Sequence, residues 1–312
     1  MDHYSRSALN TFAGLVLNRK PSPDAPDLRD ALDRALYVVV RGDEILFDAS
    51  RHEPLLLAPT MLGHCAQALV QAMHLGDDGQ CSYFAINIER LSPGATNCLS
   101  SLGSFVPLRE HAAILPSQMA ALLGYARSIA GWHSMARFCS LCGHPTVPKP
   151  GSLAQACTNP DCGAQHFPRV DPAMIVLIHH AGTHGDKCLL GRQATWKPKV
   201  YSAISGYVEP GESAEDAVLR EVMEETGISV TDVRYFSSQP WPFSGSLMLG
   251  FHARAITTRI RLDETELEDA RWFSRHEIPA LLASGEFALP STETIARHLF
   301  DAWYSGAESR RD

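Results

Sequence analysis

The sequence has no apolar run of about 18 residues, which a membrane-spanning helix would need. Its 312 residues also contain no internal repeat and no low-complexity tract. The first 14 residues have neither a basic start nor a long apolar stretch, so we expect no secretion signal. These absences predict a cytoplasmic protein of globular domains with no membrane partner.

Positive charge is also scarce, since 27 Lys and Arg residues face 35 Asp and Glu residues and the formal net charge is -8. Such a charge argues against a broad electrostatic grip on nucleic acid and leaves only a local basic groove open. An anionic substrate would need a cation as intermediary. The length suits two or three domains, and the 45% hydrophobic content is that of an ordinary globular protein.

The chain has eight cysteines, which without a secretion signal predict reduced thiols or a metal site rather than a disulfide framework. Two pairs stand close together beside glycines: Cys139 with Cys142, and Cys157 with Cys162. Thiolates on tight turns supply the tetrahedral set that structural Zn²⁺ prefers. We expect a closed zinc site here, with four buried free cysteines as the alternative. The other cysteines are scattered and expected to be structural: Cys65, Cys81, Cys98 and Cys188.

Changes in composition along the chain predict three domains: residues 1–136, 137–168 and 169–312. The first has the pattern of a small α+β domain, and its own residues indicate no function. Its expected elements are a hairpin over 35–48, a helix over 62–75, a strand over 83–88 and a helix over 116–135 capped by Ser117. The second is rich in cysteine, glycine and proline, which is typical of a zinc ribbon. The third alternates strands and helices, so we expect an α/β layered fold.

The most informative stretch is residues 206–228, which contains one helix with an unusual charge pattern. Ser213 followed by Asp216 resembles a capping box, and Gly227 suits the position just after the helix end. Glu221 and Glu225 lie one above the other on a helix, and like charges at that spacing repel. A solvated acidic face is the plain explanation of such a run.

A divalent cation is the alternative explanation, because Mg²⁺ and Mn²⁺ take carboxylate oxygens and bridge to phosphates. The wider pattern favours the cation. With U for an apolar residue, residues 206–228 read G-x5-E-x7-R-E-U-x-E-E-x-G-U.

This pattern resembles the box of the Nudix hydrolases. The resemblance implies an α/β/α sandwich that hydrolyses a nucleoside diphosphate linked to another group. It assigns metal binding and catalysis to Glu221, Glu224 and Glu225, with Arg220 orienting them through salt bridges. Glu212 would support the loop before the helix, and Glu225 would be the essential group, as metal ligand or as base.

A second motif follows the box: residues 238–246 read SQPWPFSGS. Aromatic rings beside prolines serve either as core filler or as platforms for a flat ring. The stretch resembles the SQPWPFPxS signature of NADH pyrophosphatases of the NudC type, with Ser244 in place of a proline. Those enzymes also have a zinc ribbon and a separate N-terminal domain, so the resemblance covers most of the chain.

This second resemblance implies a set of substrate-binding residues: Phe167, Tyr207, Gln239, Pro240, Trp241, Pro242, Phe243, Ser244, Gly245, Ser246 and Ala296. It also implies two further metal ligands, the side chain of Glu266 and the carbonyl group of Ser205. Glu266 lies in an acidic loop, and a solvated acid is the other explanation for it.

The resemblance implies hydrolysis of NADH or NAD⁺ to NMN(H) and AMP, using Mg²⁺ or Mn²⁺, in a homodimer with structural Zn²⁺. Three other activities remain open: removal of NAD caps from RNA, hydrolysis of another derivative such as ADP-ribose, and binding of a nucleotide without cleavage. The intact box argues against the last of these.

Overall fold

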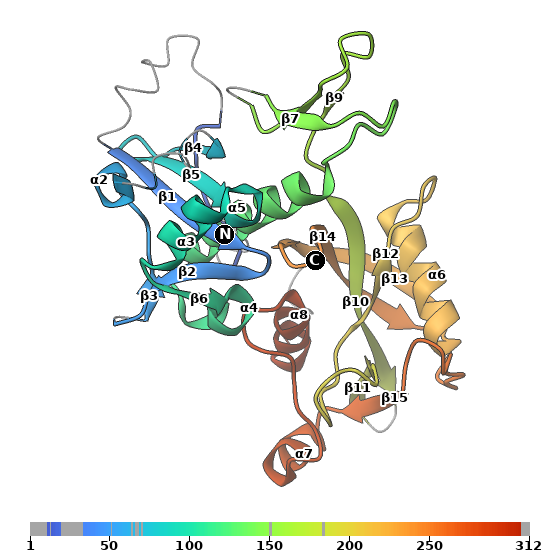
Figure 1. Ribbon diagram of the computed structural model, residues 1–312. Helices are drawn as coiled ribbons and strands as arrows, with labels where there is room; N and C mark the ends of the chain where they lie inside the picture. Colours follow the sequence, from blue (N-terminus) through green and yellow to red (C-terminus); the bar gives the residue numbers. More distant parts are fainter. Residues whose placement is uncertain are drawn as a thin grey trace. The chain divides into compact units, whose positions relative to one another are not determined.

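The computed structural model describes residues 11–12, 14–19, 34–50, 52–63, 65, 69, 71–149, 152–182 and 185–306. The chain divides into two compact units (Figure 1). The first consists of Met1–Ala13, Asp171–Trp241 and Ser246–Asp312, and the second of Gly14–Val170 and Pro242–Gly245. Within the described residues, no helix is long and apolar enough to cross a membrane. Residues 1–10, on which the expectation about a secretion signal largely rests, lie outside them.

The second unit is built on a six-stranded sheet in the order β3-β2-β1-β5-β4, with β6 pairing with β2. Strand β1 runs parallel to β5 and antiparallel to β2. The strands are β1 Ala35–Arg41, β2 Glu44–Asp48, β3 Glu53–Pro54, β4 Met73–Asp77, β5 Ser82–Asn87 and β6 Ser104–Pro107. The helices are α2 Pro59–Leu62, η3 Ile88–Arg90, α3 Pro93–Ser100, α4 Leu108–His111, η4 Ala112–Ile114 and α5 Ser117–Met135.

The predicted hairpin, the strand that follows it and the long helix of this unit are confirmed as β1–β2, β5 and α5. The predicted helix over 62–75 is wrong at its C-terminal end, because Met73–Asp77 is strand β4, paired with β5. Helix α2 ends at Leu62, and residues 64, 66–68 and 70 lie outside the described part of the chain. Pairing with a neighbouring strand outweighs the local pattern there. Ser117 is not the N-cap of α5 but its first residue; Pro116 is the cap.

The expectation that all scattered cysteines are reduced is also wrong. Cys65 and Cys98 form a disulfide across a sequence separation of 33 residues. The fold brings them together because Cys65 belongs to the same buried cluster as Leu62 and Leu99, and Cys98 packs against that cluster. Cys81 and Cys188 are free thiols, as expected.

The zinc ribbon groups with the N-terminal domain in the second unit. It is a three-stranded antiparallel sheet of β7 Thr146–Pro148, β8 Gln155–Cys157 and β9 Gln165–His166. The ribbon is joined to α5 through His133, whose Nε2 lies 2.9 Å from the carbonyl oxygen of Leu153. Burial lowers the pKa of His133 to about 4, so the ring is neutral and can donate one hydrogen bond there.

The first unit is built on a six-stranded mixed sheet in the order β13-β14-β10-β11-β15, with β12 pairing with β10. Its strands are β10 Asp171–Gly182, β11 Gly185–Arg192, β12 Ile204–Tyr207, β13 Val230–Trp241, β14 Ser246–Ala255 and β15 Asp269–Ser274. Its helices are α6 Ala214–Thr226, α7 Ile278–Ser284 and α8 Ile295–Tyr304. Strand β13 extends through the first part of the SQPWPF motif.

Alternate residues of strand β10 face two separate hydrophobic cores. Met174 and Val176 pack with Val218 of α6, whereas Ile175 and Leu177 pack with Leu299 of α8. The sheet therefore lies between the two helices, as Figure 1 shows with α6 in orange and α8 in red. This arrangement confirms the predicted α/β/α sandwich, and it places α6 with its glutamates on one face.

Helix α6 begins as its sequence predicts. Ser213 accepts a hydrogen bond from the backbone N–H of Asp216 at 3.1 Å, and Asp216 accepts from the backbone N–H of Ser213 at 3.3 Å. Gly227 ends the helix at φ 66°, a left-handed conformation that glycine adopts without steric cost. Both ends of the helix are thus fixed by local contacts.

We predict that Ser213→Ala lowers the free energy of unfolding by about 1 kcal/mol, because the first turn of α6 loses its capping oxygen. Chemical denaturation followed by circular dichroism measures the change. Ser213→Thr is the matched control, because it keeps a hydroxyl group at the same place. Equal stability of the alanine and threonine variants would contradict the prediction.

Candidate functional site

Helix α6 carries two nearly buried glutamates beside its core-facing side. Glu221 is 9% exposed and Glu225 is 5% exposed, while Val218 and Val222 on the neighbouring stripe are fully buried. The apolar stripe holds the helix on the sheet, and the glutamates therefore lie at the helix–sheet boundary rather than on the free surface. The solvated acidic face considered from sequence does not describe these two residues.

Gly206 of strand β12 is in direct contact with Glu221. A Cβ atom at position 206 would lie 2.0 Å from Glu221 Oε1, which no side chain could tolerate. Strand β12 pairs with β10, so the backbone under Glu221 belongs to the sheet itself. The glycine of the box thus allows the carboxylate to approach the strand.

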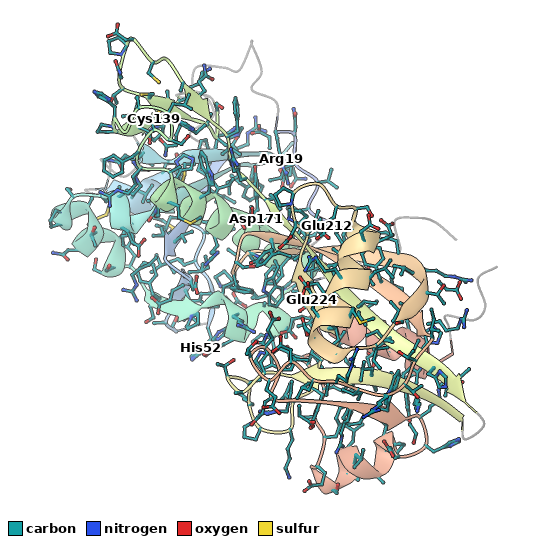
Figure 2. All side chains as sticks on the ribbon, turned by 90° about the vertical axis from the view of Figure 1, so that its right-hand side faces the viewer. Arg19, His52, Cys139, Asp171, Glu212 and Glu224 are labelled. Carbon is teal, nitrogen blue, oxygen red and sulfur yellow. A yellow bond between two sulfur atoms is a disulfide. The ribbon has the colours of Figure 1, made fainter. Side chains whose placement is uncertain are left out.

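Arg220 joins the acidic residues of this region into one network. Its guanidinium lies 2.7 Å from Glu212 Oε1, 3.0 Å from Glu221 Oε1 and 3.0 Å from Glu224 Oε2. It also donates to the carbonyl oxygen of Tyr207 at 2.9 Å. Glu212 in turn accepts from the backbone N–H of Glu209, so the loop before α6 is tied to the helix (Figure 2, where Glu212 and Glu224 are labelled). These are the salt bridges expected of Arg220 and the support expected of Glu212.

A third carboxylate reaches the same place from the chain after β14. The backbone N–H of Asp263 donates to the carbonyl oxygen of Glu225 at 3.0 Å, which fixes the segment that carries Glu266. Carboxylate oxygens of Glu221, Glu225 and Glu266 lie within 4.8 Å of one another. Three oxygen ligands at this spacing fit a hard divalent cation such as Mg²⁺ or Mn²⁺.

The other two expected metal ligands stand outside this three-carboxylate group. The side chain of Glu224 is 57% exposed and pairs with Arg220. Ser205 is exposed on strand β12, next to Gly206. The structure therefore brings together three of the five predicted ligands by their side chains, and Glu224 is directed to the arginine instead.

Electrostatics favour a cation at the three-carboxylate group. Burial, together with the charges of Glu221, Glu266 and Asp263, raises the pKa of Glu225 to about 8. Burial also raises the pKa of Glu221, against the opposing effect of Arg220. Without a cation Glu225 is mostly protonated at neutral pH, and a bound cation would take the place of its proton.

The four cysteines of the ribbon form the predicted cluster, in which Cys139 is labelled in Figure 2. The Sγ atoms of Cys139 and Cys162 lie 3.8 Å apart, and those of Cys142 and Cys157 lie 3.4 Å apart. Tetrahedral Zn²⁺ with bonds of about 2.3 Å needs sulfur separations of about 3.8 Å, so the set fits. His166 lies 3.3 Å from the sulfur of Cys139. This separation suits a hydrogen bond that stabilises a thiolate.

The predicted substrate-binding residues divide between the two units. The first unit contains Tyr207, Gln239, Pro240, Trp241, Ser246 and Ala296, and the second contains Phe167, Pro242, Phe243, Ser244 and Gly245. In the first unit a row of paired residues crosses the face covered by α8: Gln239, Met248, Ala173 and Tyr207. Tyr207, at the end of the row, is 54% exposed and follows Gly206, which touches Glu221 on the opposite face.

Gln239 differs from its expected role. It is 0% exposed, and both ends of its amide group bind backbone atoms of the chain at the start of α8. In this arrangement the amide group is used within the chain and has no exposed surface. Strand β13 directs this side chain toward α8, and substrate contact by Gln239 stays a prediction.

The two aromatic residues of the motif have different surroundings. Trp241 is partly buried, with Phe12 against it edge-on at 6.2 Å between ring centroids. The ring of Phe243 lies 5.8 Å from the guanidinium carbon of Arg109 and 5.9 Å from that of Arg127. Sequence reasoning missed Phe12, Arg109 and Arg127, and no motif or spacing singles them out. It also missed the close approach that makes Gly206 necessary, although a glycine before an acidic helix was a usable signal.

Family models match three stretches of the chain. They are a NUDIX domain at residues 169–293, an NADH pyrophosphatase-like rudimentary NUDIX domain at 34–132 and an NADH pyrophosphatase zinc ribbon domain at 135–167.

The curated relatives of this chain include proteins named NAD-capped RNA hydrolase. The human protein NUDT12 is 37% identical over 241 residues, which are 73% of this chain and 51% of that protein. NudC of Stutzerimonas stutzeri (strain A1501) is 47% identical over 182 residues, which are 58% of this chain and 61% of that protein. The chain thus spans about half to three fifths of these relatives. Among solved structures, a NUDIX hydrolase from Nitrosomonas europaea has a TM-score of 0.41 and 20% identity, covering 55% of this chain and 93% of that one.

The raised pKa of Glu225 predicts how stability depends on pH in metal-free protein. The folded chain keeps a proton that the unfolded chain releases above its ordinary pKa of 4.5, so stability falls as pH rises toward 8. The free energy of unfolding should decrease by up to about 1.4 kcal/mol per pH unit between pH 6 and 8.

Thermal unfolding across this pH range, with and without Mg²⁺, measures the effect. Glu225→Gln should remove most of the pH dependence. Adding Mg²⁺ to the wild-type protein at pH 8 should raise its melting temperature back toward the value measured at pH 6. The prediction is wrong if metal-free wild type and Glu225→Gln show the same dependence on pH.

Proposed function

This chain carries a NUDIX domain with the rudimentary NUDIX and zinc ribbon domains of NADH pyrophosphatases, and we propose that it hydrolyses NAD(H) to NMN(H) and AMP. The observation that carries the proposal is the group of Glu221, Glu225 and Glu266 around one point on the NUDIX domain. A pyrophosphate needs concentrated positive charge to react, and this group can hold it. The SQPWPF motif on β13 supports the dinucleotide as substrate.

The chemistry assigns separate tasks to the residues of the box. When bound, Mg²⁺ or Mn²⁺ would neutralise pyrophosphate oxygens and make a water more acidic. Glu221, Glu225 and Glu266 would hold the cation, with the carbonyl oxygen of Ser205 and with Glu224 as further ligands. Glu225 is the essential carboxylate, as ligand or as acceptor of the water's proton. Arg220 keeps Glu221 and Glu224 in place by the ion pairs described above.

The substrate bases would bind to the exposed ring of Tyr207 and to the aromatic residues of the motif. Tyr207 follows Gly206, whose backbone contacts Glu221, and its side chain is on the opposite face of the sheet. Ser246 and Ala296 flank the same face of the sheet and are further proposed contacts for a base. From the second unit, Phe167 of the ribbon is 62% exposed and is a further proposed contact.

Removal of NAD caps from RNA is the second proposed activity. It is favoured by the relatives named NAD-capped RNA hydrolase, to which this chain is 37% and 47% identical. The same pyrophosphate bond is cut in the free dinucleotide and in the cap. The net charge of -8 favours recognition of the cap itself over the length of the RNA.

We predict that Glu225→Gln lowers the rate of AMP release from NADH by about 10³-fold, because the substitution removes the carboxylate that binds the cation or the proton. Product analysis on NADH, NAD⁺, ADP-ribose and NAD-capped RNA, each with Mg²⁺ or Mn²⁺, measures the activity and ranks the substrates. Glu215→Gln, an exposed glutamate of the same helix, is the control and should keep full activity. A wild-type protein that binds NADH and releases no AMP would overturn the proposal.

The ribbon segment exposes apolar side chains that suit a second copy of the chain. Leu141 is 77% exposed, Phe138 is 62% exposed and Val147 is 48% exposed. Apolar groups in such number on a small segment are typical of a protein interface. We therefore propose a homodimer that uses the ribbon.

Leu141→Glu should shift the protein from dimer to monomer, because it places a charge in that interface. Sedimentation velocity at several concentrations measures the change. Ile114→Glu is the control, since Ile114 is also 77% exposed in the same unit but lies outside the ribbon. A monomeric wild type would contradict the proposal.

A further inference from the structure

Gln239 is the motif residue whose surroundings differ most from a substrate contact. Its Nε2 donates to the carbonyl oxygen of Glu293 at 2.7 Å, and its Oε1 accepts from the backbone N–H of Ile295 at 2.8 Å. One side chain of strand β13 thus satisfies two backbone groups on either side of Thr294, the N-cap of α8.

These bonds hold the part of α8 that most needs a partner. The first backbone N–H groups of a helix have no acceptor within the helix, and the N–H of Ile295 is the first of them. The side chain of Thr294 accepts a hydrogen bond from the N–H of Arg297, so the N–H of Ile295 needs a different acceptor. Gln239 supplies that acceptor from the sheet, and it binds the preceding carbonyl at the same time.

The sheet leaves little freedom for the start of α8. A Cβ atom at Gly250 would lie 2.7 Å from Cδ1 of Ile295, so the helix start rests directly on β14. One turn later, Nε2 of His252 lies 3.0 Å from the carbonyl oxygen of Leu299. Two side chains of the sheet therefore bind the backbone of α8, Gln239 at its start and His252 in its middle.

The two anchors differ in what they hold. Ala296, a proposed substrate contact, follows Ile295 directly and is 6% exposed. Gln239 also begins the row that passes through Met248 and Ala173 to Tyr207, another proposed contact. His252 binds the carbonyl group of Leu299, which is not a proposed substrate contact. A variant of His252 therefore serves as a control for loss of an anchor of α8.

We infer that Gln239 is a positioning residue: it fixes the first turn of α8, and with it Ala296, against the strand row that ends at Tyr207. This inference rests on the proposed function for the nature of the substrate. Gln239 would thus affect binding of the dinucleotide only indirectly, by fixing the position of α8.

The experiment compares Gln239→Met with His252→Phe in the full-length protein. Gln239→Met keeps the length of the side chain and removes both hydrogen bonds, while His252→Phe removes the other anchor of the same helix. The dissociation constant for NADH is measured without added Mg²⁺ or Mn²⁺, KM and kcat are measured with Mg²⁺, and the melting temperature is measured for both variants. Gln193→Met, at an exposed glutamine of the same unit, is the surface control.

We expect Gln239→Met to raise both the dissociation constant and KM about tenfold, with kcat changed less than threefold. His252→Phe should lower the melting temperature and leave both binding constants unchanged. The inference is overturned if the two variants weaken binding equally, or if Gln239→Met lowers only stability. Should Gln239→Met fail to fold, Gln239→Glu, which keeps the acceptor for Ile295 and loses the donor, is judged by the same criteria.

The binding measurement needs no turnover, so it remains valid if the proposed hydrolysis fails. Wild-type protein that binds NADH without cleaving it would contradict the proposed function alone. Tight binding by Gln239→Met, equal to that of wild type, would contradict the positioning role alone.

Discussion

The first unit depends on keeping negative charge in a place where water cannot screen it. Glu221 and Glu225 are almost fully buried one helical turn apart, and Glu266 joins them from a distant part of the chain. Such a group repels itself unless a cation or a proton is present. The positive charge of Arg220 offsets part of this negative charge. The raised pKa of Glu225 means that this carboxyl group keeps a proton at neutral pH, which removes another part. The capping box, the apolar stripe of α6 and Gly206 all act to keep the helix in place against that repulsion.

Strand β12 connects this charged group with the opposite face of the sheet. Gly206 touches Glu221, and the next residue, Tyr207, turns to the face covered by α8. Its carbonyl oxygen also binds Arg220. Two successive residues therefore link the carboxylate network to the row that Gln239 begins. Strand β12 thus contributes one residue to each face of the sheet at this point.

The features that could be predicted are those whose partners lie close together in the sequence. Ser213, Asp216 and Gly227 specify the ends of α6 by local contacts, and the spacing of Glu221 and Glu225 already indicates one stripe. Glu266 could be assigned only through resemblance, because its place depends on the bond from Asp263 to Glu225 across the fold. The partners of Gln239 and the strand β4 were missed for the same reason. Both depend on contacts between segments that are distant in sequence, and the local pattern of residues does not indicate such contacts.

The second unit contains both a disulfide, Cys65–Cys98, and a cluster of four free cysteines. The disulfide is stable under oxidising conditions, whereas the cluster needs reduced thiols. The four ribbon cysteines must stay reduced to hold a metal, with sulfurs as close as 3.4 Å that would otherwise pair with one another. The disulfide persists only where reduction is slow. A zinc ion bound to the four thiolates would protect them from oxidation and leave the Cys65–Cys98 disulfide unchanged, so both could be present in the same protein. The handling of the protein follows from this: zinc in the buffer protects the ribbon, whereas a strong dithiol would open the bridge and compete for the metal.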